Sequence, residues 1–197
     1  QSEAIQSVNN SWGVFSRSRI ELLPHQMWVC KRVTERWPAN WLIADDVGLG
    51  KTIEAGLILW PLLSRHAVRR ILILCPASLV DQWQWRLRDM FDLRFTMYSA
   101  DADTPRSDYF NTQDRIVASL ETLRLDNQGR QERLFESDPW DLVIVDEAHH
   151  LNFDERGRTL GYRLVEELKT RGKMSSTIFF TGTPHRGKDF GFWSLLK

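Results

Sequence analysis

Short apolar runs alternate along this chain with longer segments of helical spacing, and this alternation constrains the fold more than any other feature. The run at 70–75 is RILILC, apolar after its first residue, and the run at 142–145 is LVIV. Strands that are apolar without alternation are buried on both faces, which is typical of a parallel sheet covered by helices on each side. The sequence therefore predicts an α/β fold with a doubly wound, mostly parallel sheet.

The other elements follow from the same spacing and from residues that start or stop helices. Ser78, with Asp81 three residues later, is expected to cap a helix that runs to about residue 91. Further strands are expected at 41–44, 94–98, 115–118 and 177–180, further helices at 22–37, 51–64, 158–170 and 190–196, and a polar loop at 101–114.

Composition and charge exclude several classes of protein. The 26 Lys and Arg residues balance 26 Asp and Glu residues, which excludes binding of nucleic acid through bulk charge but not through a local phosphate-contacting strip. Cys30 and Cys75 lack metal-ligand spacing, so we expect two buried free thiols and a reducing, cytoplasmic compartment. No apolar run approaches the roughly 20 residues that cross a bilayer, so no membrane partner is expected. Residues 1–20 are interpreted as a polar lead-in, and 21–197 as one domain.

The sequence DDVGLGKT stands between a predicted strand and a predicted helix. Gly48 and Gly50 would let the backbone close around an anion at the helix N-terminus, where free N–H groups and the helix dipole favour phosphate. Lys51 would reach the β- and γ-phosphates, and the Thr52 hydroxyl would bind Mg²⁺. The strict phosphate-loop pattern has Gly where this chain has Asp45, so the motif alone leaves nucleotide binding and an ordinary loop equally open.

A second motif, DLVIVDEAHH, is an apolar strand that ends in the carboxylates Asp146 and Glu147. Ligands of open α/β sheets bind at the carboxyl ends of the strands. Asp146 would hold Mg²⁺, and Glu147 would orient and deprotonate an attacking water. The alternative is an acidic pair that only caps the next helix. This alternative is less favoured, because the phosphate-loop motif and the acidic motif would both bind the same magnesium phosphate. We therefore expect Lys51 and Asp146 at neighbouring strand tips, where they share one ATP and its Mg²⁺.

Together with TGTP at 181–184, these motifs occur in an order that resembles the helicase-like ATPases of superfamily 2. The stretch IADDVGLGKTIEAGLI is particularly similar to the Swi/Snf-related translocases, and within them to the bacterial branch typified by the RNA-polymerase-associated protein RapA. In that group Asp45 is expected, and Asp46 stands in place of Glu. The resemblance runs from about residue 22 to residue 197. It implies a RecA-like P-loop NTPase lobe, the helicase ATP-binding domain at 21–197, with the family's second lobe absent from this chain.

The resemblance also assigns residues to the nucleotide and to nucleic acid. Gln26 would read the adenine edge, although without the family it is an ordinary residue at a helix start. The residues implied to bind ATP are Gln26, Asp46, Val47, Gly48, Leu49, Gly50, Lys51 and Thr52. LILCPASLVDQW and ASLETL resemble the family's strand-contacting segments. Their candidate contacts are Pro76, Ser78, Gln82, Ser119 and Thr122, with Ser119 as a plain helix cap in the alternative interpretation.

The TGTP segment resembles the motif that links the ATP site to strand movement. Thr181 and Thr183 would contact the acids or Mg²⁺-bound water, and His149 would hydrogen-bond towards this segment; ordinary turn chemistry explains TGTP equally well in isolation. A metal site built from His149, His150 and His185 is not favoured, because these histidines lack the spacing of known zinc motifs.

The resemblance implies an ATP hydrolase that couples hydrolysis to movement on duplex DNA, with Lys51, Asp146 and Glu147 as its catalytic residues and Mg²⁺ at Thr52 and Asp146. The second lobe of the same parent protein and RNA polymerase are its expected protein partners, in a cytoplasmic or nucleoid-associated setting. A strand-separating DEAH-type helicase of RNA or DNA and a nucleotide-gated protein-binding module are the alternatives. Without the second lobe's arginine, this chain is expected to hydrolyse ATP barely.

Overall fold

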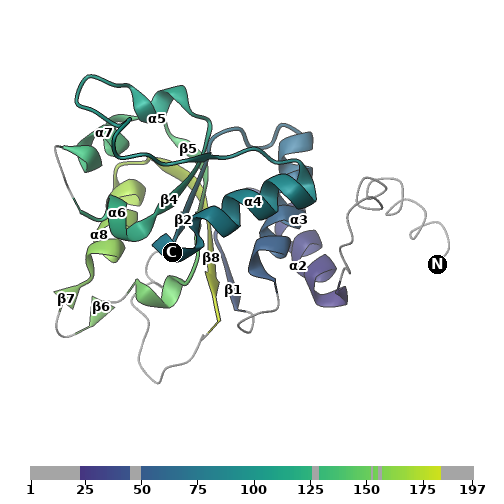
Figure 1. Ribbon diagram of the computed structural model, residues 1–197. Helices are drawn as coiled ribbons and strands as arrows, with labels where there is room; N and C mark the ends of the chain where they lie inside the picture. The colour runs from purple at the N-terminus through teal and green to yellow at the C-terminus, as the bar shows by residue number, and fades with distance from the viewer. Residues whose placement is uncertain (1–22, 45–49, 126–128, 152, 155–156, 183–197) are drawn as a thin grey trace.

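The computed structural model describes residues 23–44, 50–125, 129–151, 153–154 and 157–182 (Figure 1). Its centre is a six-stranded sheet with the order β1-β8-β5-β2-β4-β3. All of its strand pairs are parallel, which confirms the predicted α/β fold. The strands are β1 (Trp41–Ala44), β2 (Ile71–Cys75), β3 (Thr96–Met97), β4 (Arg115–Ser119), β5 (Trp140–Val145) and β8 (Met174–Thr181).

Helices cover both faces of this sheet, as Figure 1 shows. Along β2, Ile71 and Ile73 point into one hydrophobic core, and Leu72 and Leu74 point into the other. The first core is closed by α2 (Pro24–Glu35), α3 (Lys51–Ser64) and α4 (Val80–Phe91). The second is closed by α5 (Tyr109–Thr112), α6 (Leu120–Leu123), α7 (Arg130–Glu136) and α8 (Leu160–Thr170). Burial of the sheet on both faces explains why its central strands are continuously apolar.

The order of the strands corrects one expectation. The two motifs were expected at neighbouring strand tips, but β8 lies between β1 and β5. Its register pairs Ile178 with both Trp41 of β1 and Ile144 of β5. The two motifs nevertheless meet, because Lys51 is on the first turn of α3 and its long side chain spans the width of one strand.

The start of α4 is also different from the prediction. Ser78 does not cap α4; it lies in a single 3₁₀ turn, η2 (Ala77–Leu79), and α4 begins at Val80 without a side-chain cap. Pro76 precedes this turn, and its carbonyl accepts a hydrogen bond from the Leu79 N–H at 2.9 Å. The chain therefore tightens immediately after the proline, so Ser78 lies inside a helical turn rather than before it.

Several smaller elements depart from the sequence-based expectations. The strand expected at 94–98 is reduced to Thr96–Met97, and the loop at 101–114 contains α5. The helix expected from residue 158 begins at Leu160, after a short antiparallel pair of strands, β6 (Phe153–Asp154) and β7 (Gly157–Arg158). The helix expected at 190–196 and the lead-in at 1–20 lie outside the described residues, and the domain boundary at 21 stays a prediction. Among the described residues, no helix is long and apolar enough to cross a membrane.

Candidate functional site

The carboxyl ends of five parallel strands bring most of the predicted residues to one edge of the sheet. Across this edge, β1 leads towards the phosphate-loop sequence, β8 ends at Thr181, and β5 leads into Asp146. Beyond them, β2 leads into Pro76, and β4 ends at Ser119. The nucleotide candidates that the structure describes thus lie in one half of the edge, the nucleic-acid candidates lie in the other half, and the acids lie between them.

Gly50 forms the turn from the loop into α3. Its φ of +91° is left-handed, a conformation that suits glycine. A Cβ at this position would lie 3.2 Å from Gln26 Nε2, so the Gln26 side chain packs directly against the turn. Gln26 is 1% exposed, and its Oε1 accepts a hydrogen bond from Leu23 N at 3.3 Å. Both interpretations of Gln26 are therefore compatible with the structure: it caps a helix start, and it borders the loop. Residues 45–49 lie outside the described residues.

Asp146 follows β5 and is held by hydrogen bonds on both carboxylate oxygens. Its Oδ2 accepts from the indole Nε1 of Trp83 at 2.9 Å, and its Oδ1 accepts from the Glu147 N–H at 2.8 Å. The side chain is 5% exposed. Burial raises the pKa of Asp146 above its usual value, while the Trp83 hydrogen bond and the nearby Lys51 oppose this rise.

Lys51 faces both acids from the start of α3. Its Nζ donates a hydrogen bond to Glu147 Oε1 at 2.6 Å and lies 3.8 Å from Asp146 Oδ1. Glu147 has a left-handed backbone with φ of +50°, a conformation that is uncommon for this residue type and that is often found at functional sites. The Glu147 side chain makes no capping hydrogen bond to the short helix η3 (Ala148–His150) that follows. The carboxylates of Asp146 and Glu147 thus face Lys51 rather than the N-terminus of η3, which disagrees with the alternative that they only cap a helix.

His149 links the acids to the end of β8. Its Nδ1 lies 3.1 Å from Glu147 Oε2 and 3.3 Å from Thr181 Oγ1. The sequence predicted that His149 would hydrogen-bond towards the TGTP segment, and the structure places it there. Thr183 and His185 lie outside the described residues, and the coupling role of His149 and Thr181 stays a prediction.

The nucleic-acid candidates surround a carboxylate that sequence reasoning did not single out. Glu121 Oε2 accepts from the Ala77 N–H and from the Ser119 hydroxyl, each at 3.0 Å. Ser119 Oγ also accepts from Thr122 N at 3.1 Å, as a helix cap does. Glu121 therefore connects the turn after β2 to the turn after β4 by hydrogen bonds, one of them from the candidate residue Ser119. Ser78 and Gln82 are exposed, and Pro76 is half-buried.

Sequence and structure comparisons place this geometry in a known family. The SNF2-related domain family matches residues 25–197. The chain belongs to this family. The SWI2/SNF2 ATPase core of Sulfolobus solfataricus in complex with dsDNA is 26% identical, with a TM-score of 0.72 over 90% of this SNF2-related chain and 35% of that chain. A second structure of that core domain is 25% identical, with a TM-score of 0.69 over 90% of this chain and 34% of that chain.

The helicase domain of Pyrococcus furiosus Hef shares the fold of this SNF2-related domain. It is 24% identical, with a TM-score of 0.66 over 84% of this chain and 33% of that chain. The RecA-like architecture with its six parallel strands is thus shared with SNF2 ATPase cores. The chain spans about a third of the length of these solved relatives.

The donor atoms at the edge of this SNF2-related domain fit a magnesium ion. Asp146 offers a buried carboxylate, and Thr52, also 5% exposed, offers a hydroxyl on the first turn of α3. Mg²⁺ prefers oxygen ligands and usually takes one or two protein groups together with phosphates and water. Within the part of the chain that the structure describes, no group of three or more His, Cys, Asp or Glu residues could hold a metal. His185, the third histidine of the site considered from the sequence, lies outside the described residues.

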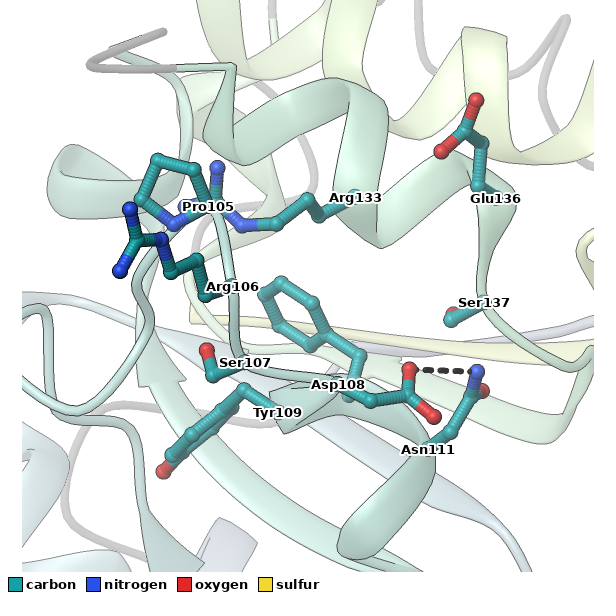
Figure 2. Close-up of a pocket in the computed structure, with 10 residues that line it drawn as sticks. Pro105, Arg106, Ser107, Asp108, Tyr109, Asn111, Arg133, Glu136 and Ser137 are labelled. Atoms are coloured by element: carbon teal, nitrogen blue, oxygen red, sulfur yellow. Dashed lines mark hydrogen bonds between the residues drawn. The ribbon is translucent and has the colours of Figure 1, made fainter.

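Two cavities lie beside the described elements, and neither contains Lys51 or the acids. One of about 360 Å³ lies between the loop at 105–111 and α7, with Arg106 and Arg133 on its wall (Figure 2). The other, of about 430 Å³, lies between α2 and β1 and reaches Ala44 and Glu54, which flank the phosphate loop in the sequence. Of these two cavities, the second is the one that borders the candidate nucleotide site.

Trp83, like Glu121, is a residue at this site that sequence reasoning missed. Its spacing with Leu87 and Phe91 places it on the inward face of α4, which indicates only a core position. The one available signal was the indole N–H, because a buried tryptophan usually finds an acceptor. Nothing in the sequence identifies that acceptor as Asp146.

Proposed function

We propose that this SNF2-related chain is the ATP-binding lobe of an ATP-dependent DNA translocase. The observation that carries the proposal is the meeting of Lys51 with Glu147 and Asp146, at 2.6 and 3.8 Å, at the carboxyl edge of a parallel sheet. A cation and two carboxylates beside a glycine turn and a helix N-terminus form an arrangement that binds a triphosphate with its metal.

In the proposed reaction, each side chain acts at a defined atom. Lys51 leaves Glu147 and places its ammonium on the β- and γ-phosphate oxygens of ATP, while Gln26 pairs with the adenine edge. Released from the lysine, the Glu147 carboxylate orients the attacking water and accepts its proton. Thr52 and Asp146 would hold Mg²⁺, which when bound neutralises phosphate charge. The Glu147 proton can pass towards His149, whose Nδ1 lies 3.1 Å away.

The other half of the edge is proposed to contact duplex DNA. Phosphate groups can be held by hydroxyls, backbone N–H groups and amides without a net positive charge, and Ser78, Gln82, Ser119 and Thr122 provide such groups. Support comes from the similar Sulfolobus solfataricus core, whose structure was determined in complex with dsDNA. A second RecA-like lobe of the parent protein would complete the track, and RNA polymerase would be a partner if the chain belongs to the RapA-like branch.

Substitution of the central pair in the full-length protein tests this function. Glu147→Gln is expected to lower DNA-stimulated ATP hydrolysis by roughly 10²–10⁴-fold, the usual contribution of a general base, and to leave nucleotide binding intact. Lys51→Ala is expected to weaken nucleotide binding itself. Unchanged DNA-stimulated hydrolysis in both variants would reject the assigned roles, and strand separation by the wild type would favour the helicase alternative.

Lys31 and Glu35 provide the matched control. They form an exposed ion pair of 3.8 Å on α2, with side chains 72% and 54% exposed. Lys31→Ala and Glu35→Gln make the same chemical changes away from the site, and both variants should keep wild-type hydrolysis.

A further inference from the structure

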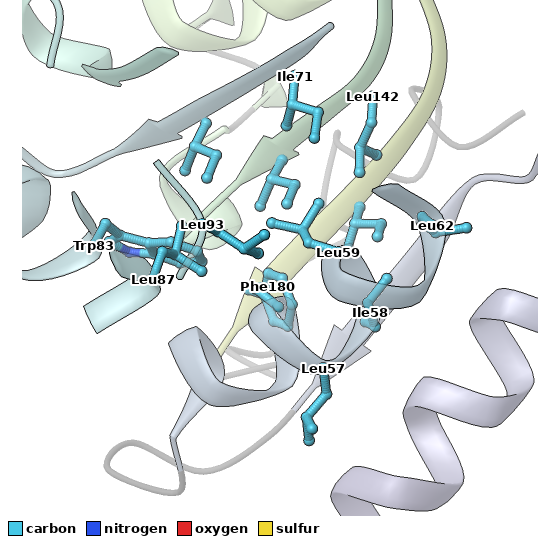
Figure 3. Close-up of a cluster of buried hydrophobic side chains, with 14 of the residues drawn as sticks. Leu57, Ile58, Leu59, Leu62, Ile71, Trp83, Leu87, Leu93, Leu142 and Phe180 are labelled. Atoms are coloured by element: carbon cyan, nitrogen blue, oxygen red, sulfur yellow. The ribbon is translucent and has the colours of Figure 1, made fainter. Parts of the chain in front are cut away.

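Trp83 connects α4 with Asp146 and with the end of β8 through two direct contacts. It lies on α4, is 1% exposed, and donates its indole N–H to Asp146 at 2.9 Å. Its ring also packs against Phe180 of β8, with ring centroids 6.3 Å apart. Figure 3 shows Trp83 extending from α4 towards Phe180 within the hydrophobic cluster. The residue after Phe180 is Thr181, which contacts His149.

The hydrogen bond to Trp83 restrains the carboxylate that is proposed to hold Mg²⁺. Asp146 Oδ1 is fixed by its neighbour's backbone N–H at 2.8 Å, so the indole on Oδ2 determines the remaining rotation of the carboxylate plane. Hydrogen bonds that orient a ligating carboxylate commonly change metal affinity by one to two orders of magnitude.

The buried indoles of this sheet differ in whether the N–H has an acceptor. Trp140, at the start of β5, is 0% exposed, and within the described residues its Nε1 has no hydrogen-bond partner. Trp83, in contrast, directs its N–H to Asp146 at 2.9 Å, so the two buried indoles differ in their contact with the site.

The helix that carries Trp83 also reaches the proposed DNA-contacting half of the edge. Gln82, the adjacent residue, is exposed, and Ser78 lies in the turn just before α4. A helix moves as a rigid unit over this length, so a displacement at its first turn also moves the indole that holds Asp146.

We propose that Trp83 is a positioning residue that sets the orientation of Asp146 for Mg²⁺ and couples it to DNA contact at the start of α4. The inference rests on the proposed function, because it assumes that Asp146 binds magnesium with ATP. It identifies one hydrogen bond as the physical link between the two halves of the edge.

The test compares Trp83→Phe with Trp140→Phe in the full-length protein. Both substitutions remove an indole from an equally buried position, but only the first removes the hydrogen bond to Asp146. Binding of a fluorescent ATP analogue is titrated with Mg²⁺, and the DNA dependence of kcat and KM is measured separately. For Trp83→Phe we expect about a tenfold higher Mg²⁺ requirement, the effect of losing one hydrogen bond to a charged group, with metal-free nucleotide binding unchanged.

The DNA-dependent readout has its own expectation. In Trp83→Phe, saturating duplex DNA should raise kcat by a factor several times smaller than in the wild type, with little change in KM for DNA. Trp140→Phe should keep the wild-type Mg²⁺ requirement and DNA stimulation. Identical Mg²⁺ titrations and DNA stimulation for the two variants would overturn the inference.

A second variant and the wild-type titration separate the possible failures. If Trp83→Phe does not fold, benzothienylalanine at position 83 keeps the bicyclic ring and replaces the N–H with sulfur, and the same shift in Mg²⁺ requirement is expected. If the wild type shows no Mg²⁺-dependent nucleotide binding, the proposed function fails, and the inference fails with it. If the wild type binds Mg²⁺ and ATP and the Trp83 variant binds them equally well, the inference fails while the proposed function stands.

Discussion

Gly56→Ala tests how closely the helices that carry the site are packed together. Gly56 lies on α3, and a Cβ there would be 2.1 Å from Phe91 Cε2, 2.4 Å from Cδ2 and 2.5 Å from Cζ. Phe91, at the end of α4, is 5% exposed. Because carbon atoms pack at roughly 3.5–4 Å, the rigid ring or one of the helices must move by more than about 1 Å.

The expected cost is the balance of two terms. Overpacking a core costs about 1–3 kcal/mol, and replacing a helix-interior glycine with alanine returns about 1 kcal/mol through helix propensity. Three atoms of the Phe91 ring would lie too close to the new methyl group, so we expect an overpacking cost in the upper part of the 1–3 kcal/mol range, about 2–3 kcal/mol. After the helix-propensity gain is subtracted, the unfolding free energy should fall by roughly 1–2 kcal/mol. Urea denaturation measures this loss.

A double-mutant cycle decides whether the clash is the cause. Phe91→Leu removes the ring atoms that the new methyl group meets, so Gly56→Ala should cost nothing, or should stabilise the protein, in the Phe91→Leu background. The coupling between the two substitutions should exceed about 1 kcal/mol, as it does for residues in contact. A Gly56→Ala variant as stable as the wild type, or two effects that simply add, would refute this account of the packing.

Three further predictions concern buried polar groups. Burial raises the pKa of Asp146 in the folded state. The nucleotide-free protein should therefore lose unfolding free energy, relative to Asp146→Asn, as the pH rises from the usual carboxyl range through the raised pKa. A difference in unfolding free energy between the two proteins that does not change with pH would contradict this. Asp103→Ala should lower the unfolding free energy, measured by urea denaturation, by about 3–5 kcal/mol. The reason is that the fully buried Asp103 carboxylate forms an ion pair with Arg133 at 2.7 Å. A loss below about 1 kcal/mol would argue against a stabilising role for this ion pair. Burial raises the pKa of the Cys30 thiol to about 12 and also raises the pKa of the Cys75 thiol. Both thiols should therefore react with a disulfide reagent only after the protein unfolds. Rapid labelling of either cysteine in the native protein would contradict this prediction.

The local elements near the site could be predicted from the sequence because their signals are local. The strand at 41–44 and the helix at 51–64 have the bounds that spacing predicted. A helix cap was the alternative interpretation of Ser119, and the hydrogen bond from Thr122 N shows that cap. Both cysteines are buried and free, as their apolar surroundings indicated.

The remaining features depend on contacts between residues far apart in the chain. Insertion of β8 between β1 and β5 cannot be derived from any one strand, because it depends on how all three strands pair in the sheet. The hydrogen bond from Trp83 to Asp146 and the hydrogen bonds that Glu121 accepts from Ala77 and Ser119 join separate turns in the same way. The start of α4 was mispredicted for a local reason, since the turn after Pro76 competes with a cap at Ser78.

The central claim is that Lys51 and Asp146 serve one magnesium nucleotide. The most direct measurement uses an acyl-phosphate derivative of ATP, which transfers its acyl group to a lysine beside the bound phosphates, followed by peptide mass spectrometry of the full-length protein. Lys51 should be labelled in a Mg²⁺-dependent manner, and the labelling should be suppressed by excess ATP and abolished by Asp146→Asn. Labelling confined to other lysines, or labelling of Lys51 that is unaffected by Mg²⁺ and by Asp146→Asn, would contradict it.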